Sequence, residues 1–242
     1  MKTYKIFPLL IGRLFADIGT FNYANFSGEK RWYPIFSFLI QGDGRNVLID
    51  SGCVAEEMAA VSAIKAGYED VKPLEEALKE RGLTVEDITE VIQTHLHSDH
   101  WLNGKRLPRA TFWVQEEELA FAMNPHPFFS RSFNRKRYEG MKFKAIKGDT
   151  RFAEGIEILY TPGHSAGTQS VQIETDQGKA IIAGFCSIPE NFYPPDKALE
   201  VIPPGYHLDL LQGYDSVLRI KKSGAIIIPL HDPNLEGKTT IP

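Results

Sequence analysis

The stretch His95-Leu96-His97-Ser98-Asp99-His100 places three imidazoles and one carboxylate within six residues. It comes directly after a strand that the sequence predicts at residues 89–93. Neutral imidazole nitrogens and carboxylate oxygens are the ligands that bind Zn²⁺ and similar borderline cations. If the chain leaves the strand in an extended turn, the first two histidines point to one side, and Asp99 and His100 face a second position nearby. This spacing predicts a site for two metal ions, which can generate hydroxide from water at neutral pH.

Two later histidines stand in settings that suit metal ligands. His164 follows an apolar strand predicted at residues 156–160 and a Pro-Gly turn, and such turns expose a side chain at a sheet edge. His231 comes just after a β-branched run at residues 226–228, which is typical of a buried strand. Each of these histidines alone fits a structural role equally well. Beside the first cluster, both are predicted to be ligands delivered from strand ends.

The order of these motifs along the chain is informative. His95-x-His97-x-Asp99-His100 is followed by Gly163-His164 and then by Leu230-His231-Asp232. This pattern resembles the metallo-β-lactamase superfamily, and most closely its N-acyl-homoserine-lactonase-like branch. Further segments that resemble this branch are Asp50-Ser51-Gly52, Ile202-Pro203-Pro204-Gly205 and His207-x-Asp209. The resemblance extends from about Tyr4 to Pro233, which is nearly the whole chain.

The resemblance implies a role for each motif residue. The first metal ion would be held by His95, His97 and His164, and the second by Asp99, His100 and His231. A metal-bound hydroxide would attack and open a lactone or a related cyclic or acyl ester, and Asp99 would orient it and shuttle a proton to the leaving oxygen. The metals would be two divalent ions, zinc first, with iron, manganese and cobalt also open.

One position departs from the family pattern. The family usually supplies an aspartate that bridges both metals, in a Gly-Asp pair between the second and third histidine segments. Here the matching residues are Gly184-Phe185-Cys186, and Phe185 stands in register with the missing carboxylate. Cys186 could serve as a metal ligand in its place, because zinc favours sulfur, although neighbouring strand residues normally point to opposite faces. A role for Cys186 as a small buried hydrophobic residue is the alternative.

The missing carboxylate leaves the reaction open as well. Hydrolysis of an amide, a thioester or a phosphoester on the same fold is one alternative to lactone opening. A metal-binding sensor or interaction protein without efficient catalysis is another. Retention of every other ligand favours an enzyme.

Three residues outside the ligand set are candidates for the site. Asp50 follows a predicted buried strand and could orient a ligating histidine, or simply satisfy backbone N–H groups in its turn. Tyr193 is predicted to be catalytic, as a hydrogen-bond donor to a developing oxyanion, with ordinary packing as the alternative. His207 could be a polar pocket residue or a surface histidine.

An insert at about residues 116–140 combines five aromatic residues with four basic ones. An ordinary helix pair with a solvated basic face is one interpretation. The other is a lid or dimer contact whose aromatic side chains line an acyl or aromatic substrate pocket, with basic residues that attract an anionic substrate. The sequence leaves the oligomeric state open, with a homodimer through this insert as one option.

Length and composition limit the classes of protein. The chain has 242 residues without a low-complexity linker, which fits a single metallo-hydrolase domain over 1–242. The net charge of −4 gives no electrostatic argument for nucleic acid or membrane partners, so a small-molecule substrate is expected. No apolar run approaches the ~20 residues of a membrane span, and the N-terminus does not resemble a secretory signal. With two cysteines only, a reduced, cytoplasmic protein is expected.

Periodicity predicts an α/β protein. Strands are predicted at residues 4–11, 35–41, 46–49, 89–93, 110–114, 143–146, 156–160, 170–174, 179–183 and 225–228. Helices are predicted at residues 71–81 and 208–222, and Thr84 with Asp87 is expected to cap a short turn. Two strand-rich halves with interspersed helices favour two packed mixed β-sheets with helices on the outer faces, which agrees with the αββα sandwich that the resemblance implies.

Overall fold

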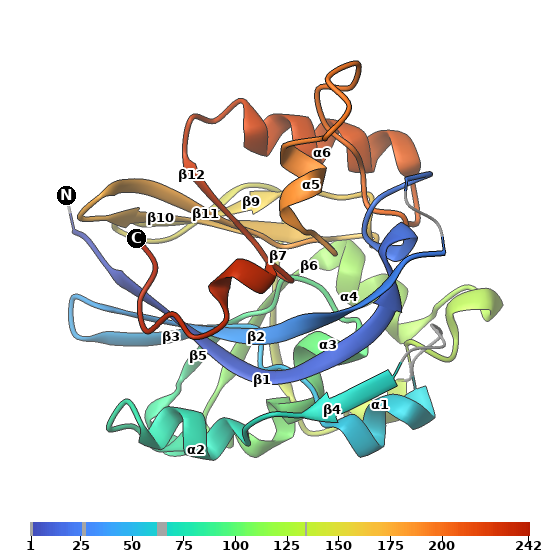
Figure 1. The fold of residues 1–242 in the computed structure, drawn as a ribbon. Coiled ribbons are helices and arrows are strands. Elements are labelled where there is room, and N and C mark those ends of the chain that lie inside the picture. The colour runs from blue at the N-terminus through green and yellow to red at the C-terminus, as the bar shows by residue number, and fades with distance from the viewer. Residues whose placement is uncertain (1, 26–27, 62–66, 134) are drawn as a thin grey trace.

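The computed structural model describes residues 2–25, 28–61, 67–133 and 135–242. Two mixed β-sheets pack face to face, and helices cover their outer faces (Figure 1). The predicted αββα sandwich is therefore confirmed. Within the described residues, no helix has the length and apolar character needed to cross a membrane.

The first sheet has seven strands in the order β4-β1-β2-β3-β5-β6-β7. Antiparallel pairing joins β4, β1, β2 and β3, and parallel pairing joins β3, β5, β6 and β7. The bounds of these strands are β1 Lys5–Asp17, β2 Lys30–Gly42, β3 Arg45–Ile49, β4 Gly67–Asp70, β5 Glu90–Ile92, β6 Thr111–Gln115 and β7 Lys142–Ile146.

The second sheet has five strands in the order β12-β11-β10-β9-β8. Only β11 and β12 pair in parallel, and the other neighbours are antiparallel. The bounds of these strands are β8 Thr150–Ala153, β9 Ile156–Tyr160, β10 Gln169–Thr175, β11 Gly178–Ala183 and β12 Ile226–Pro229.

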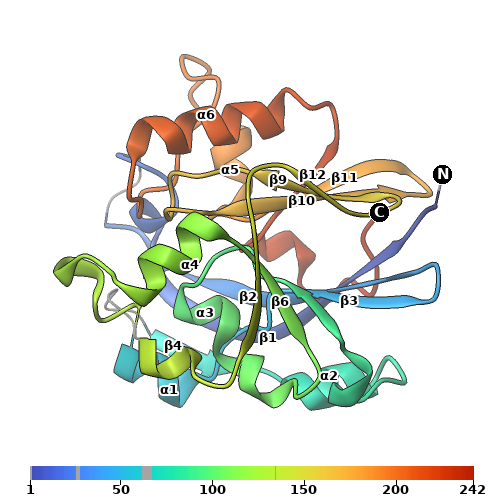
Figure 2. The same cartoon turned by 180° about the vertical axis from the view of Figure 1, so that it is seen from behind.

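Helices occupy both outer layers. Figures 1 and 2 show α5 and α6 over the second sheet, and α1 and α2 on the far side of the first sheet. The α-helices are α1 Ala55–Val61, α2 Leu74–Lys79, α3 Ser98–Trp101, α4 Glu116–Met123, α5 Pro189–Phe192 and α6 Leu210–Lys221.

Alternation along the strands builds the layers. On β11, Ile182 packs in the core between the two sheets, whereas its neighbours Ile181 and Ala183 pack in the outer layer with Val217 and Ile220 of α6. This period of two is what a strand buried on both faces requires. The two sheets therefore share one apolar core, and a second cluster anchors α6.

The predicted elements are found, with different ends. The strand predicted at 4–11 continues to Asp17 as β1, since it pairs along its length with β2. The helix predicted from 71 starts at Leu74, because Pro73 precedes it and the N–H groups of Val71 and Lys72 donate to Ile11 O. The sequence analysis missed α1, β4, β8 and α5, and it expected an extended turn where α3 begins at Ser98. The turn at Thr84 is confirmed, with its N–H donating to Asp87 Oδ2 at 2.7 Å.

The 116–140 segment contains α4 and two short 3-10 turns, Pro127–Phe129 and Arg135–Tyr138. The expected helix pair is thus one helix followed by irregular chain. Phe133 and Tyr138 are buried in the core cluster that also holds Leu96 and Trp101. The segment is therefore packed against the chain that carries the histidine cluster.

Gly184 follows β11 and lies against β10 so closely that a Cβ atom there would be 1.7 Å from Gln169 O. That oxygen belongs to a strand backbone and cannot move cheaply. We therefore expect Gly184→Ala to lower the free energy of unfolding by about 3 kcal/mol, measured by urea denaturation.

Gly213→Ala is the matched control. A Cβ atom at this position in α6 would meet Pro203 Cβ at an ordinary 3.7 Å. Alanine is preferred to glycine inside a helix, so this variant should be unchanged or stabilised by up to about 1 kcal/mol. Equal stability losses in the two variants would contradict the assigned role of close packing at Gly184.

Candidate metal centre

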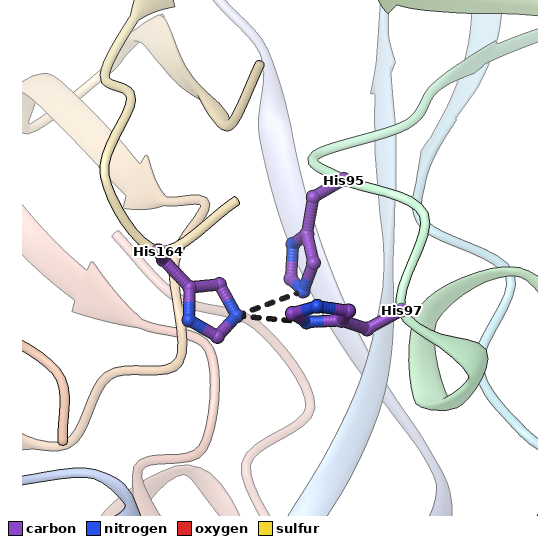
Figure 3. A group of neighbouring side chains, drawn as sticks. All are labelled: His95, His97 and His164. Carbon is purple, nitrogen blue, oxygen red and sulfur yellow. Dashed lines mark hydrogen bonds between the residues drawn. The ribbon is translucent and has the colours of Figure 1, made fainter. Parts of the chain in front are cut away.

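Three histidines from two loops converge on one point. His95 Nε2 lies 3.2 Å from His164 Nε2, and His97 Nδ1 lies 3.0 Å from the same atom. Figure 3 draws both contacts as dashed lines and shows the three rings pointing toward one another. All three side chains are buried. The chain thus brings together the three residues predicted to hold the first metal.

The second predicted group also assembles. Asp99 Oδ2 lies 3.2 Å from His100 Nε2 and 3.8 Å from His231 Nε2. Within each group of three, the ligand atoms lie within 4.8 Å of one another, so each group could hold a metal ion. The motif spacing predicted a site for two metal ions, and the fold assembles two separate groups of candidate ligands.

Hydrogen bonds on the outer ring atoms fix the tautomers of the first group. His95 Nδ1 donates to Gly184 O at 2.9 Å, and His164 Nδ1 donates to Tyr206 O at 2.6 Å. Because a neutral imidazole carries one proton, both Nε2 atoms face each other with lone pairs. Two lone pairs at 3.2 Å repel unless a cation lies between them, so these residues fit a metal ion.

The second group shows the same arrangement. His100 Nδ1 donates to Asp50 Oδ2 at 2.8 Å, and His231 Nδ1 donates to Pro34 O at 2.9 Å. The Nε2 atoms of both histidines are buried and face Asp99 Oδ2, at 3.2 Å for His100 and 3.8 Å for His231. A cation beside Asp99 could take both nitrogens as ligands, with His100 giving up its second proton on binding.

Burial keeps most of these imidazoles neutral. It lowers the pKa of His97 and of His231 to about 4, and it lowers the pKa of His95 and His164 well below the ordinary value. A neutral imidazole is the form that binds a metal, so at pH 7 protons do not compete for these nitrogens.

Asp99 and His100 behave as an ion pair. Burial alone would lower the pKa of His100, but the Asp99 and Asp50 carboxylates outweigh it and raise that pKa to about 10. Burial also opposes ionisation of Asp99, yet His100 and His231 hold the pKa of its carboxyl below the usual range. Asp99 is therefore ionised at neutral pH and supplies the negative charge of this group.

Asp50 holds the histidine loop through hydrogen bonds to its carboxylate. Its backbone adopts a positive φ of 58°, and its side chain is fully buried. Besides His100, the carboxylate accepts hydrogen bonds from Gln93 Nε2, Thr94 N and Thr94 Oγ1 at 2.7–2.8 Å. The structure thus places Asp50 where the sequence analysis expected it, orienting a histidine of the cluster.

Glu118 performs a similar task and was not predicted. This buried carboxylate of α4 accepts from Leu96 N at 2.8 Å, Ser165 Oγ at 2.6 Å and Gly167 N at 2.8 Å. It therefore ties the loop that carries His95 and His97 to the loop that carries His164. Nothing in the sequence distinguishes it from Glu116 and Glu117, and the structure shows that only Glu118 of these three glutamates is buried.

A pocket opens over both groups. Its lining includes every residue of the two groups except His231, together with apolar side chains, and no lysine or arginine is among the described residues that line it. The apolar wall consists of Leu14, Phe21, Met58 and Tyr68. The basic residues of the insert therefore do not contribute to the lining, and the expectation that they attract an anionic substrate finds no support there.

Cys186 lines this pocket, but its sulfur belongs to neither group of ligand atoms. Phe185 points the opposite way, into the apolar cluster beneath α6, with its ring centroid 5.8 Å from that of Phe192. The alternation along the chain thus turns the position of the missing aspartate away from the site and turns the cysteine toward it.

The structure does not bring Tyr193 to the pocket. Its side chain is 63% exposed and lies near Lys221, since α5 buries the preceding Phe192 and directs the next residue outward. His207 is also outside the lining, with Nδ1 donating to Pro204 O at 2.9 Å. The tyrosines that line the pocket are Tyr68 and Tyr206, and sequence reasoning singled out neither.

The chain matches the model of the metallo-beta-lactamase superfamily over residues 31–229. It belongs to this superfamily. The expected resemblance to the lactonase branch is also confirmed, because N-acyl homoserine lactonases are among its similar proteins. AiiA of Bacillus thuringiensis subsp. kurstaki is 27% identical to it over 242 residues, which cover 96% of this chain and 94% of AiiA.

Solved structures agree with this assignment. The structure of a quorum-quenching N-acyl homoserine lactone hydrolase superposes with a TM-score of 0.79 at 26% identity, covering 98% of this chain and 96% of that one. A second structure of an N-acyl homoserine lactone hydrolase, described with the product N-hexanoyl-L-homoserine at the catalytic metal centre, has a TM-score of 0.79 at 24% identity and the same coverage. The fold is thus that of the superfamily throughout.

Glu118→Gln tests the link between the two histidine loops. A glutamine can replace only one of the two carboxylate acceptors, so its amide group would face a backbone or hydroxyl donor. We expect the free energy of unfolding to fall by about 2–3 kcal/mol in thermal or urea denaturation. Glu116→Gln, at an exposed position of the same helix, should change it by less than about 0.5 kcal/mol. An equally stable Glu118→Gln variant would contradict this role.

Proposed function

We propose that the protein is a metal-dependent hydrolase that opens a lactone or a related cyclic or acyl ester. The observation that carries this proposal is the pair of ligand groups, whose tautomers are fixed by outer hydrogen bonds before any metal arrives. The similar proteins named N-acyl homoserine lactonases support the choice of a lactone. A pocket without lysine or arginine in its described lining suits such an uncharged substrate.

The two groups would hold two divalent ions, with zinc favoured and iron, manganese or cobalt as alternatives. One would be bound by His95, His97 and His164, and the other by Asp99, His100 and His231. When bound, such ions lower the pKa of water and polarise a carbonyl oxygen. Asp99, ionised and at the pocket, is the group placed to accept a proton and pass it to the leaving oxygen.

Cys186 takes part in this proposal as the group that replaces the missing bridging carboxylate. Its side chain lines the pocket beside Asp99, whose charge, together with burial, raises the pKa of the thiol well above the ordinary value. A cation nearby would reverse that effect and favour the thiolate. A cytoplasmic location and a homodimer remain predictions from the sequence.

Hydrolysis of N-hexanoyl homoserine lactone is the direct test. We expect turnover by the metal-loaded protein, and a loss of more than about 100-fold after chelation or in His97→Ala, because the first group then lacks a ligand. Rates are measured by proton release, and metal content by elemental analysis. His126→Ala removes an exposed histidine outside both groups, so this variant should keep the hydrolysis rate and the metal content of the unmodified protein.

Other outcomes separate the alternatives. Preferred turnover of an amide, thioester or phosphodiester would assign a different hydrolase on the same fold. Tight metal binding without turnover of any of these compounds would favour a sensor. Full activity in metal-free buffer would refute the metal-dependent mechanism.

Cobalt substitution tests the role of Cys186 without relying on activity. If the thiolate binds the second metal, the Co²⁺ protein should show a sulfur-to-cobalt charge-transfer band in the near ultraviolet, and Cys186→Ser should lose it. Cys53→Ser is the matched control, because Cys53 is buried but does not line this pocket. Absence of the band from the unmodified cobalt protein would remove Cys186 from the coordination sphere.

A further inference from the structure

Tyr206 lies in the pocket and touches the first histidine group in two ways. Its backbone oxygen accepts the hydrogen bond from His164 Nδ1. Its ring packs against the imidazoles of His97 and His164, with centroid distances of 5.2 and 6.0 Å. These contacts fix the ring at the wall of the pocket, next to the nitrogens of the first group.

The hydroxyl of Tyr206 is left available. Oη is buried, and the side chain of Ser132, which also lines the pocket, interacts with it in a sense that lowers the pKa of the phenol, as a donor to Oη does, although the contact lacks the full geometry of a hydrogen bond. A hydroxyl that accepts from Ser132 still has its own proton to donate. Ser98 Oγ, in the same pocket, is buried without a partner of full geometry among the described residues. Buried hydroxyls normally make complete hydrogen bonds, so these two indicate that a polar group of a substrate completes them.

We propose that Tyr206 is a catalytic residue whose hydroxyl donates a hydrogen bond to the carbonyl oxygen of the ester or lactone. The inference rests on the proposed hydrolytic function and adds a residue to it. A donor aimed at the oxygen where negative charge develops stabilises the transition state more than the bound substrate. Ser98 is the second polar group on that side of the pocket.

The same observations explain why Tyr193, the donor expected from the sequence, does not fit that role. A phenol outside the pocket cannot reach a carbonyl held at the ligand groups, whereas Tyr206 lines the same pocket as His97 and His164. The oxyanion donor expected from the sequence is therefore supplied, in this proposal, by another tyrosine thirteen positions along the chain.

The experiment compares Tyr206→Phe with Tyr193→Phe, two changes that each remove one hydroxyl. Tyr206→Phe should lower kcat by about 100-fold with a much smaller change in KM. Metal content should not change, because the backbone oxygen that holds His164 remains. The melting temperature should change little, because the hydroxyl's contact with Ser132 lacks the full geometry of a hydrogen bond. Tyr193→Phe should match the unmodified protein in all four quantities.

The outcomes are distinguishable. An active protein whose kcat is unchanged in Tyr206→Phe would overturn this inference and leave the proposed function intact. A fall in melting temperature or metal content that accounts for the lost rate would show a structural role and would also overturn it. An unmodified, metal-loaded protein that opens no lactone or ester would overturn the proposed function and this inference with it.

Discussion

The structure depends on one electrostatic constraint, the convergence of imidazole lone pairs in a buried space. Each of the histidines His95, His100, His164 and His231 donates its Nδ1 proton outward, to a backbone oxygen or to Asp50. The inner nitrogens of His95 and His164 are thereby left as acceptors that face each other, and His231 Nε2 faces the Asp99 carboxylate, while His100 pairs with that carboxylate. This arrangement costs free energy in an apolar interior unless a cation compensates it. The outer hydrogen bonds therefore prepare the site for a metal ion, because they leave the inner nitrogens of the neutral histidines without protons.

Two buried carboxylates hold the loops that meet at this site. Asp50, after β3, accepts a hydrogen bond from the chain after β5. Glu118, on α4, accepts hydrogen bonds from that same chain and from the loop after β9, and so joins the two. Neither belongs to the two candidate ligand groups, and burial raises the pKa of both while their hydrogen bonds oppose that shift. Asp50 holds two loops of the first sheet together, and Glu118 links the first sheet to a loop of the second. The positions of the candidate ligands therefore depend on both sheets.

The sequence identified the residues of both candidate ligand groups, because most of their geometry is local. The His95–His100 motif fixes its own spacing, and His164 and His231 each follow a strand that periodicity reveals. The fold class followed from the same strands. Tyr206 and Glu118 could not be found in this way, because one sits in irregular chain and the other in a run of three glutamates. Packing against distant segments decides which of the three glutamates is buried and whether Tyr206 reaches the pocket, and a single sequence does not show that packing.

The replacement of the bridging carboxylate changes the charge of the site as well as its ligands. Phe185 is turned into the core under α6, so Asp99 is the one carboxylate that lines the described part of the pocket. With Cys186 as a neutral thiol, a site holding two divalent ions would have one negative ligand fewer than the family pattern and a larger positive charge, whereas a Cys186 thiolate would restore that negative charge. Either site favours a neutral substrate that becomes negative at its carbonyl oxygen during attack. The apolar wall of the pocket strengthens this preference, because it offers no counter-charge to a substrate that is already ionised.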